Sequence, residues 1–127
     1  MNNSHRKRGL YRLGVLSLFL FALAAFSSAR TPMTTSVNIV NNSTGEIRNV
    51  YLSHVESDDW TANQLANGTT IGAGQSYNLS NVVCDQEQVK LIGEDQDGCF
   101  LSTVVSCGSS STWTITNDTA RDCGGGQ

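Results

Sequence analysis

Two clusters of acidic side chains are the residues best suited to bind a cation: Glu56, Asp58 and Asp59 form the first, and Glu94, Asp95 and Asp97 form the second. Hard cations such as Ca²⁺ prefer several oxygen ligands that converge on one point. The second cluster is followed by Gly98 and begins like a calcium-binding loop, but it lacks the downstream glutamate that such a loop needs at its twelfth position. Because Asp-Gly is also a favoured hairpin turn, we interpret 95–98 as a turn and keep calcium at Asp95 and Asp97 as the weaker alternative.

The basic and nucleophilic side chains form no recognisable catalytic motif. His54 is the single histidine after residue 29, and no G-x-S-x-G, phosphate loop, dinucleotide fingerprint or H-E-x-x-H is present. Paired acids hydrolyse glycosides only in a substrate cleft, which so small a domain rarely contains. We therefore expect no enzyme and no cofactor. A small hydrolase built on His54 or the paired acids is the third hypothesis.

A 20-residue segment, 56–75, has no strand character and combines an acidic start with Trp60. Loops of this length in a compact domain usually carry function or structure of their own. If the protein has a ligand, we expect Asp58, Asp59 and Trp60 to contact it, with the indole ring as a stacking surface for a sugar. The alternative is structural: part of the segment forms a short helix capped by Asp58, and Trp60 and Leu65 pack on the core as a lid. Their helical spacing favours the lid.

The four cysteines, Cys84, Cys99, Cys107 and Cys123, all lie in the second half of the chain. Their gaps of 15, 8 and 16 residues provide no tight zinc knuckle, so two disulfides are expected. If strands 88–94 and 99–107 form a hairpin, Cys84 lies near Cys107; if 99–107 and 111–117 form the next one, Cys99 lies near Cys123. The predicted disulfides are therefore Cys84–Cys107 and Cys99–Cys123.

Short runs rich in Val, Ile, Leu and Tyr, separated by turn-forming clusters, predict an all-β fold, a small antiparallel sandwich of six to eight strands with at most one short helix. The expected strands are Ser36–Asn41, Ile47–Val55, Ser76–Val83, Gln88–Glu94, Cys99–Cys107 and Ser111–Asn117. Asn41 to Gly45 supplies turn residues, so the first two strands are expected to form a hairpin. The last three strands are expected to form a continuous meander, with 99–107 in the middle.

The first 29 residues have the three parts of a secretory signal: a basic start, a 14-residue apolar run and small residues before Ala29. Cleavage near Ala29 leaves one domain, 30–123, and a glycine-rich tail, 124–127, that we expect to be disordered. Four basic and 11 acidic side chains follow the signal, which gives a formal charge of −7. Such a surface repels phosphate backbones and anionic lipid, so no nucleic-acid partner is expected. No run after residue 29 is long and apolar enough to span a membrane.

Several short motifs occur in a familiar order: Val37-Asn-Ile-Val-Asn-Asn-Ser-Thr-Gly45, Val50-Tyr-Leu-Ser53, Asp59-Trp60, Leu65, Ile71-Gly-Ala-Gly-Gln-Ser-Tyr77 and Glu94-Asp-Gln-Asp-Gly98. This order resembles small exported bacterial β-sandwich proteins of unassigned function, in which an N-x-T-G strand end precedes an L-Y-V-S strand and a D-x-W loop. Cys99 and Cys123 are additional to that pattern. The resemblance implies the fold and export, and it implies no catalytic residue.

The function expected from these observations is that of a non-enzymatic module. We expect a secreted or periplasmic, disulfide-stabilised interaction or structural domain, monomeric, whose partner is an unknown protein or glycan at the cell surface. The alternative is a calcium-dependent or carbohydrate-binding module that uses the 56–75 segment.

Overall fold

The computed structural model describes residues 33–124, and the expected signal peptide and residues 125–127 of the expected tail lie outside this range. Six strands follow one another in the chain: β1 (Met33–Asn42), β2 (Ile47–Ser53), β3 (Ser76–Cys84), β4 (Gln88–Asp95), β5 (Phe100–Ser106) and β6 (Ser111–Thr116). Each one overlaps a strand predicted from the sequence. The described range holds no helix, and so none that could cross a membrane.

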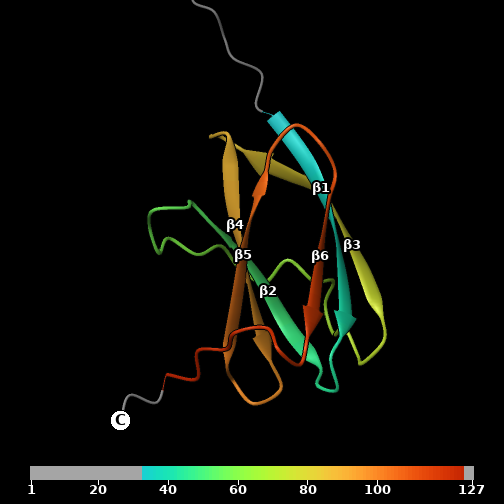
Figure 1. Cartoon of the computed structure of the whole chain (residues 1–127). Helices are drawn as coiled ribbons and strands as arrows, with labels where there is room; N and C mark the ends of the chain where they lie inside the picture. The colour runs from blue at the N-terminus through green and yellow to red at the C-terminus, as the bar shows by residue number, and fades with distance from the viewer. Residues whose placement is uncertain (1–32, 125–127) are drawn as a thin grey trace, which may run out of the picture. The chain divides into compact units, whose positions relative to one another are not determined.

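The strands form two sheets of three, in the orders β3-β1-β6 and β2-β4-β5, as labelled in Figure 1. The fold is the predicted all-β sandwich. Three of the pairings are antiparallel, and the fourth, between β1 and β6, is parallel. The first and last strands therefore lie side by side and run in the same direction.

The core lies between the two sheets and follows the alternation of the strands. Each strand sends its buried apolar side chains inward: Val37 and Ile39 from β1, Val50 and Leu52 from β2, Leu79 and Val82 from β3, Val89 and Leu91 from β4, Leu101 and Val105 from β5, and Trp113 and Ile115 from β6. Trp113 is the largest of these. A Cβ on Gly93 of β4 would lie 3.4 Å from its ring, so the glycine makes room for the indole to reach the opposite sheet.

Asn41 governs how the chain passes from one sheet to the other. The predicted hairpin between the first two strands is wrong, because β1 and β2 belong to different sheets. Asn41 is fully buried, and its amide nitrogen donates hydrogen bonds to the carbonyls of Gly45, Ile71 and Gly72 at 2.8, 2.9 and 3.2 Å. Its side-chain oxygen accepts from the Ser43 amide, which forms an Asx turn. These bonds turn the chain across the sandwich instead of back along β1.

The predicted meander is correct for its first hairpin and wrong for its second. β4 and β5 pair antiparallel, with Val89 opposite Val105, and so form the predicted hairpin. β6 instead joins the other sheet, beside β1, so β4 and not β5 is the middle strand of its sheet. The turn at 108–110 thus connects the two sheets, because β1 offers β6 a free edge in the sheet whose inner face needs Trp113 and Ile115.

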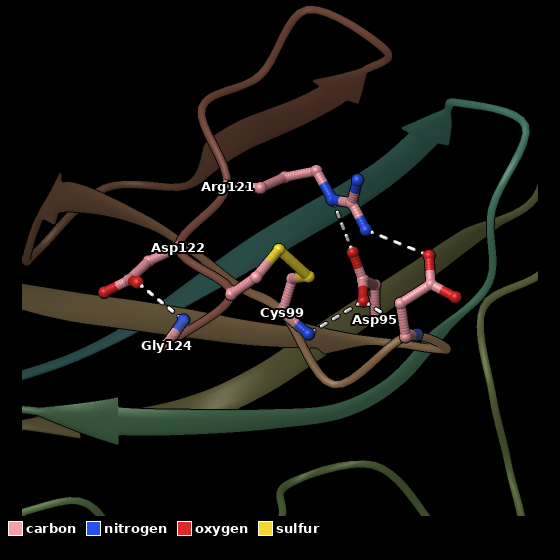
Figure 2. Close-up of a disulfide and its surroundings, with 7 residues drawn as sticks. Asp95, Cys99, Arg121, Asp122 and Gly124 are labelled. Atoms are coloured by element: carbon pink, nitrogen blue, oxygen red, sulfur yellow. Dashed lines mark hydrogen bonds and ion pairs between the residues drawn. A yellow bond between two sulfur atoms is a disulfide. The ribbon is translucent and has the colours of Figure 1, made fainter. Parts of the chain in front are cut away.

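Both predicted disulfides are present, Cys84–Cys107 and Cys99–Cys123. The first joins the end of β3 to the residue after β5, and so it links the two sheets. The second forms for a different reason from the one predicted. After β6 the chain returns to β5, where Asp122 and Phe100 exchange backbone hydrogen bonds of 2.7 and 2.8 Å. These bonds bring Cys123 to Cys99, and Figure 2 shows the resulting disulfide at Cys99. Two such bonds indicate an oxidising compartment.

The buried amide of Asn41 gives the first testable prediction. Asn41→Leu removes the buried amide that donates to the carbonyls of Gly45, Ile71 and Gly72, so we expect the free energy of unfolding to fall by about 2–3 kcal/mol. Urea denaturation of the oxidised protein measures it. Asn42→Ala, at the exposed neighbouring position, is the matched control and should change stability by less than about 0.5 kcal/mol. Equal effects of the two substitutions would contradict this role for Asn41.

The second prediction concerns Cys99–Cys123, which closes a loop with a sequence separation of 24 residues. Replacing both cysteines by alanine should lower the free energy of unfolding by about 3 kcal/mol, because the denatured chain regains the freedom of that loop. The far-ultraviolet circular dichroism spectrum should remain that of a β protein, since none of the core strands is altered. A variant as stable as the parent would show that the returning segment is held by its other contacts.

Candidate functional site

The segment between β2 and β3 covers the outer edge of β2. The backbone amides of Thr61 and Gln64 donate to the carbonyls of Leu52 and Val50 at 2.9 and 2.7 Å. The Thr61 hydroxyl and the Asn63 side-chain oxygen accept from the Leu52 and Val50 amides at 3.0 and 2.9 Å. The predicted short helix is therefore wrong: these side chains complete the hydrogen bonds of a sheet edge, which requires an extended path. Leu65 is buried in the core, as the sequence suggested.

Trp60 lies on the outer face of the β2-β4-β5 sheet and not between the sheets. Its ring stacks on Tyr51 with centroids 5.5 Å apart and meets Phe100 edge-on at 5.1 Å. Ile92, in the middle strand between these rings, is only 2% exposed, whereas Trp60 remains 39% exposed. Trp60 thus covers one residue of the outer face and still presents ring surface to solvent. We call Tyr51, Trp60 and Phe100, with Ile92 beneath them, the aromatic face.

The polar groups around the aromatic face hold its rings in place. The Glu94 carboxylate accepts hydrogen bonds from the Tyr51 hydroxyl and from the side-chain amide of Asn49, both at 2.8 Å. Partial burial raises the pKa of the Tyr51 phenol, and the hydrogen bond to Glu94 raises it further. Beside them a hollow of about 160 Å³ is bordered by Trp60, Phe100, Lys90, Ser102 and Asp122. The site is therefore an aromatic platform with charged groups at its rim.

The two predicted aspartates have different environments. Asp58 is almost fully exposed, with Lys90 Nζ 3.6 Å away. Asp59 is also exposed, but it accepts hydrogen bonds from the hydroxyls of Ser57 and Ser53 and from the His54 backbone amide, at 2.7, 3.0 and 3.1 Å. The bond from Ser57 and those from His54 hold the pKa of the Asp59 carboxyl well below its usual range. Asp58 is available to a ligand, whereas Asp59 shapes the turn that carries Trp60.

His54 connects that turn to the β3–β4 turn. Its Nδ1 pairs with the Asp59 carboxylate, and its Nε2 lies 2.8 Å from an Asp85 oxygen. The hydrogen bond to Asp85 raises the pKa of the imidazole most, and the bond to Asp59 raises it further. The pKa of Asp85 is lowered in return.

Within residues 33–124, no serine hydroxyl is hydrogen-bonded to His54. A hollow of about 250 Å³ adjoins the ring, bordered by apolar side chains that include Leu52, Val83 and Val89. Both ring nitrogens are occupied by carboxylates, and the neighbouring Ser53 hydroxyl donates to Asp59 and to backbone carbonyls, not to the ring. A serine nucleophile needs a hydrogen bond to its base. The arrangement is that of an ion-paired surface histidine.

Asp95 and Asp97, the weaker calcium alternative, form the turn that the sequence favours. The Asp95 carboxylate accepts from the amides of Asp97 and Cys99 and from Arg121 Nε, at 2.9, 3.0 and 2.8 Å (Figure 2). Burial alone would raise the pKa of this carboxyl, but the Cys99 amide and Arg121 together lower it. A second guanidinium nitrogen lies 3.0 Å from Asp97. Arg121 thus supplies the positive charge that a calcium ion would bring, and within residues 33–124 no three potential metal-ligating side chains converge.

Trp60 and Asp58 belong to the candidate site, but several of its members were not predicted. Tyr51, Phe100 and Lys90 come from three different strands or strand ends. They share the outer face of the sheet because of the strand register. Tyr51 of β2 lies opposite Ile92 of β4, and Lys90 stands two residues before Ile92 on the same face of β4. Phe100 of β5 lies opposite Glu94, two residues after Ile92. The outward position of Tyr51 was readable from alternation along β2. Which side chains lie beside Tyr51 depends on the order of the strands in the sheet, and the pattern along one strand does not show that order.

Comparisons with known proteins assign no family. No protein-family model matches the chain, and no curated protein matches it. Among solved structures, a protein from Eubacterium rectale determined by NMR is similar with a TM-score of 0.45 and 17% sequence identity, over 71% of this chain and 84% of that one. A similarity this distant supports no conclusion about function.

The His54 ion pairs give a prediction about pH. The folded-state pKa of His54 is raised, so its stabilising contribution is complete below the unfolded pKa of about 6.5 and is lost as pH rises through the higher folded value. We expect the melting temperature to fall between pH 6 and pH 8.5. In His54→Gln, which cannot become charged, this part of the fall should disappear. Identical pH profiles for the parent and His54→Gln would show that the ion pairs contribute nothing.

Proposed function

We propose that this protein is an exported, non-enzymatic interaction module that binds a protein partner at the cell surface through the aromatic face. The observation that carries this proposal is the position of Trp60, which is 39% exposed on a sheet whose other side packs the core. Trp and Tyr are enriched where protein interfaces bury their strongest contacts. Val104, on the same face of β5 beyond Ser102, is a further exposed apolar side chain, at 43%.

The rigidity of the aromatic face supports a role in binding. Trp60 is carried by a segment that is hydrogen-bonded along β2, and Tyr51 is fixed by Glu94. Little side-chain freedom is then lost when a partner binds, and this loss is one of the main costs of association. Asp58 and Lys90 at the rim supply charges that select a partner of complementary charge.

We infer that the protein reaches its partner by export. The basic start, apolar run and small residues before Ala29 support a signal peptide cleaved there, and the mature domain is then secreted or periplasmic. Two disulfides suit such a compartment. The motif order described above supports a place among small exported bacterial sandwich proteins of unassigned function.

The other hypotheses have less support. A hydrolase lacks a nucleophile bonded to His54, and calcium at Asp95 and Asp97 would have to displace Arg121. Sugar stacking on Trp60 uses the same ring as the proposed interface. The experiment must therefore separate a protein from a glycan.

A photo-crosslinking amino acid placed at two exposed positions tests the proposal. Ser102 borders the aromatic face, and Thr114 on the outer face of the other sheet is the matched control. In the producing cells we expect a discrete protein adduct from position 102 and none from position 114. Trp60→Ala should abolish the adduct while costing about 1 kcal/mol of stability, since the ring pairs with only two others.

Three results would contradict the proposed interface: equal adducts from both positions, an adduct that survives Trp60→Ala, or a loss of stability above about 3 kcal/mol in that variant, as expected for a core lid. Tryptophan fluorescence that responds to neutral oligosaccharides only when Trp60 is present would assign the aromatic face to a glycan instead.

A further inference from the structure

The two sheets differ completely in charge. Not one residue of β1, β3 or β6 is ionisable apart from the inward-facing Tyr77 and the disulfide-bonded Cys84. Every acidic and basic side chain in residues 33–124 lies in the other sheet, in a connecting segment or in the segment after β6. A domain with a formal charge of −7 after its signal therefore has one uncharged side.

The outer face of the β3-β1-β6 sheet is made mostly of hydroxyl and amide side chains. The outward positions carry Thr34, Ser36, Asn38 and Asn42 on β1, Ser76, Asn78 and Ser80 on β3, and Thr112, Thr114 and Thr116 on β6, together with two uncharged apolar residues, Val40 on β1 and the exposed Val83 near the end of β3. We call this set the neutral face. At its centre Asn38 of β1 lies opposite Asn78 on one side and Thr112 on the other. The face presents donors and acceptors side by side on three strands, and no aromatic ring.

The neutral face is hollowed along β1. One hollow, of about 270 Å³, is bordered by Ser36, Asn38, Asn78 and Thr112, and a second, of about 290 Å³, by Thr34, Ser36 and Ser80. The two adjoin each other at Ser36. A β-bulge lies there, because β3 places Ser80 and Asn81 opposite Ser36 alone, with Asn81 at φ 59°. Bulges bend the strand that carries them.

Solubility does not require such a face. Exposed protein surfaces are usually about 25–35% charged, and free sheet edges such as β3 and β6 are commonly protected by charged side chains. The outer face of the β3-β1-β6 sheet carries no charged side chain, and neither do its two edge strands. The charged side chains of the domain lie in the other sheet and in the segments outside the strands. The absence of charge is therefore a property of one face and not of the composition.

We propose that the neutral face binds an uncharged polysaccharide chain along the hollows beside β1. Hydroxyl and amide groups both donate and accept, so they can replace the water bound to sugar hydroxyls without leaving a charge unpaired. The acidic remainder of the domain repels anionic polymers and attracts cationic ones to its own side, so an uncharged chain is the partner that suits this face. The site is distinct from the aromatic face and does not depend on the function proposed for it.

Sedimentation with insoluble polysaccharides tests this inference. The purified oxidised protein is mixed with cellulose, chitin, β-1,3-glucan and, as the anionic counterpart, insoluble polygalacturonate. We expect at least one neutral polymer to bind the protein, with the bound fraction unchanged between 0.05 and 1 M NaCl because no ion pair is formed. The anionic polymer should bind none.

Two variants place a charge at the centre of the neutral face, Asn38→Asp and Thr112→Lys. Each should reduce binding by at least tenfold while keeping the parent melting temperature. Because they introduce opposite charges, a loss in both identifies the need for neutrality. Ser102→Asp on the opposite sheet is the matched control, and Trp60→Ala is the second; both should bind as the parent does.

The inference is overturned if none of the neutral polymers binds, if binding falls with salt, or if Trp60→Ala abolishes it. It is also overturned if the protein is a dimer in sedimentation equilibrium that Asn38→Asp converts to a monomer, since the neutral face would then be an interface between two copies. A failure of the crosslinking experiment leaves these outcomes unchanged, because they use another face and another readout.

Discussion

The two-sheet arrangement depends on the hydrogen bonds of the buried Asn41 side chain. β1 must leave its sheet at Asn42, and the chain must cross the sandwich and enter the other sheet at Ile47. Buried polar groups have to be hydrogen-bonded, and here one amide serves three carbonyls from two separate segments. The backbone of the same residue bonds Gln75 and Gly74. The start of β2, the end of the long segment and the start of β3 are thus positioned by a single residue.

The Asn41 hydrogen bonds also help to explain why segment 56–75 is ordered without a helix. Its end is held at Ile71 and Gly72 by Asn41, its middle runs along β2, and its start is held by Asp59 and His54. Each fixed point uses a polar side chain to satisfy backbone groups at an otherwise open sheet edge. Trp60 lies between the start of the segment, which Asp59 holds, and the part that is hydrogen-bonded along β2 from Thr61 onward. Its side chain is therefore the one that extends over the outer face of the sheet.

Short runs rich in Val, Ile, Leu and Tyr between turn-forming clusters identified all six strands, because this pattern is a property of each strand by itself. They did not show which sheet a strand joins. The run Thr112-Trp113-Thr114-Ile115 offers the same inner face to either sheet, and only the place left beside β1 decides the matter. The Cys99–Cys123 pairing was correct although its hairpin was not, since the chain returns to β5 by another path. For the same reason Trp60 was identified as a candidate site residue, while Tyr51 and Phe100, which lie beside it through strand order, were not.

The two disulfides interleave along the chain, in the order Cys84, Cys99, Cys107 and Cys123. Any single cut of the backbone between Cys84 and Cys123 therefore leaves both fragments joined by at least one sulfur bridge. A protease that reaches the exposed turn at 108–110, where nicking is easiest, removes nothing from the molecule. Three of the six strands, β4, β5 and β6, lie within this stretch. About half of the domain is in this way protected against loss by one cut, for as long as the two disulfides stay oxidised.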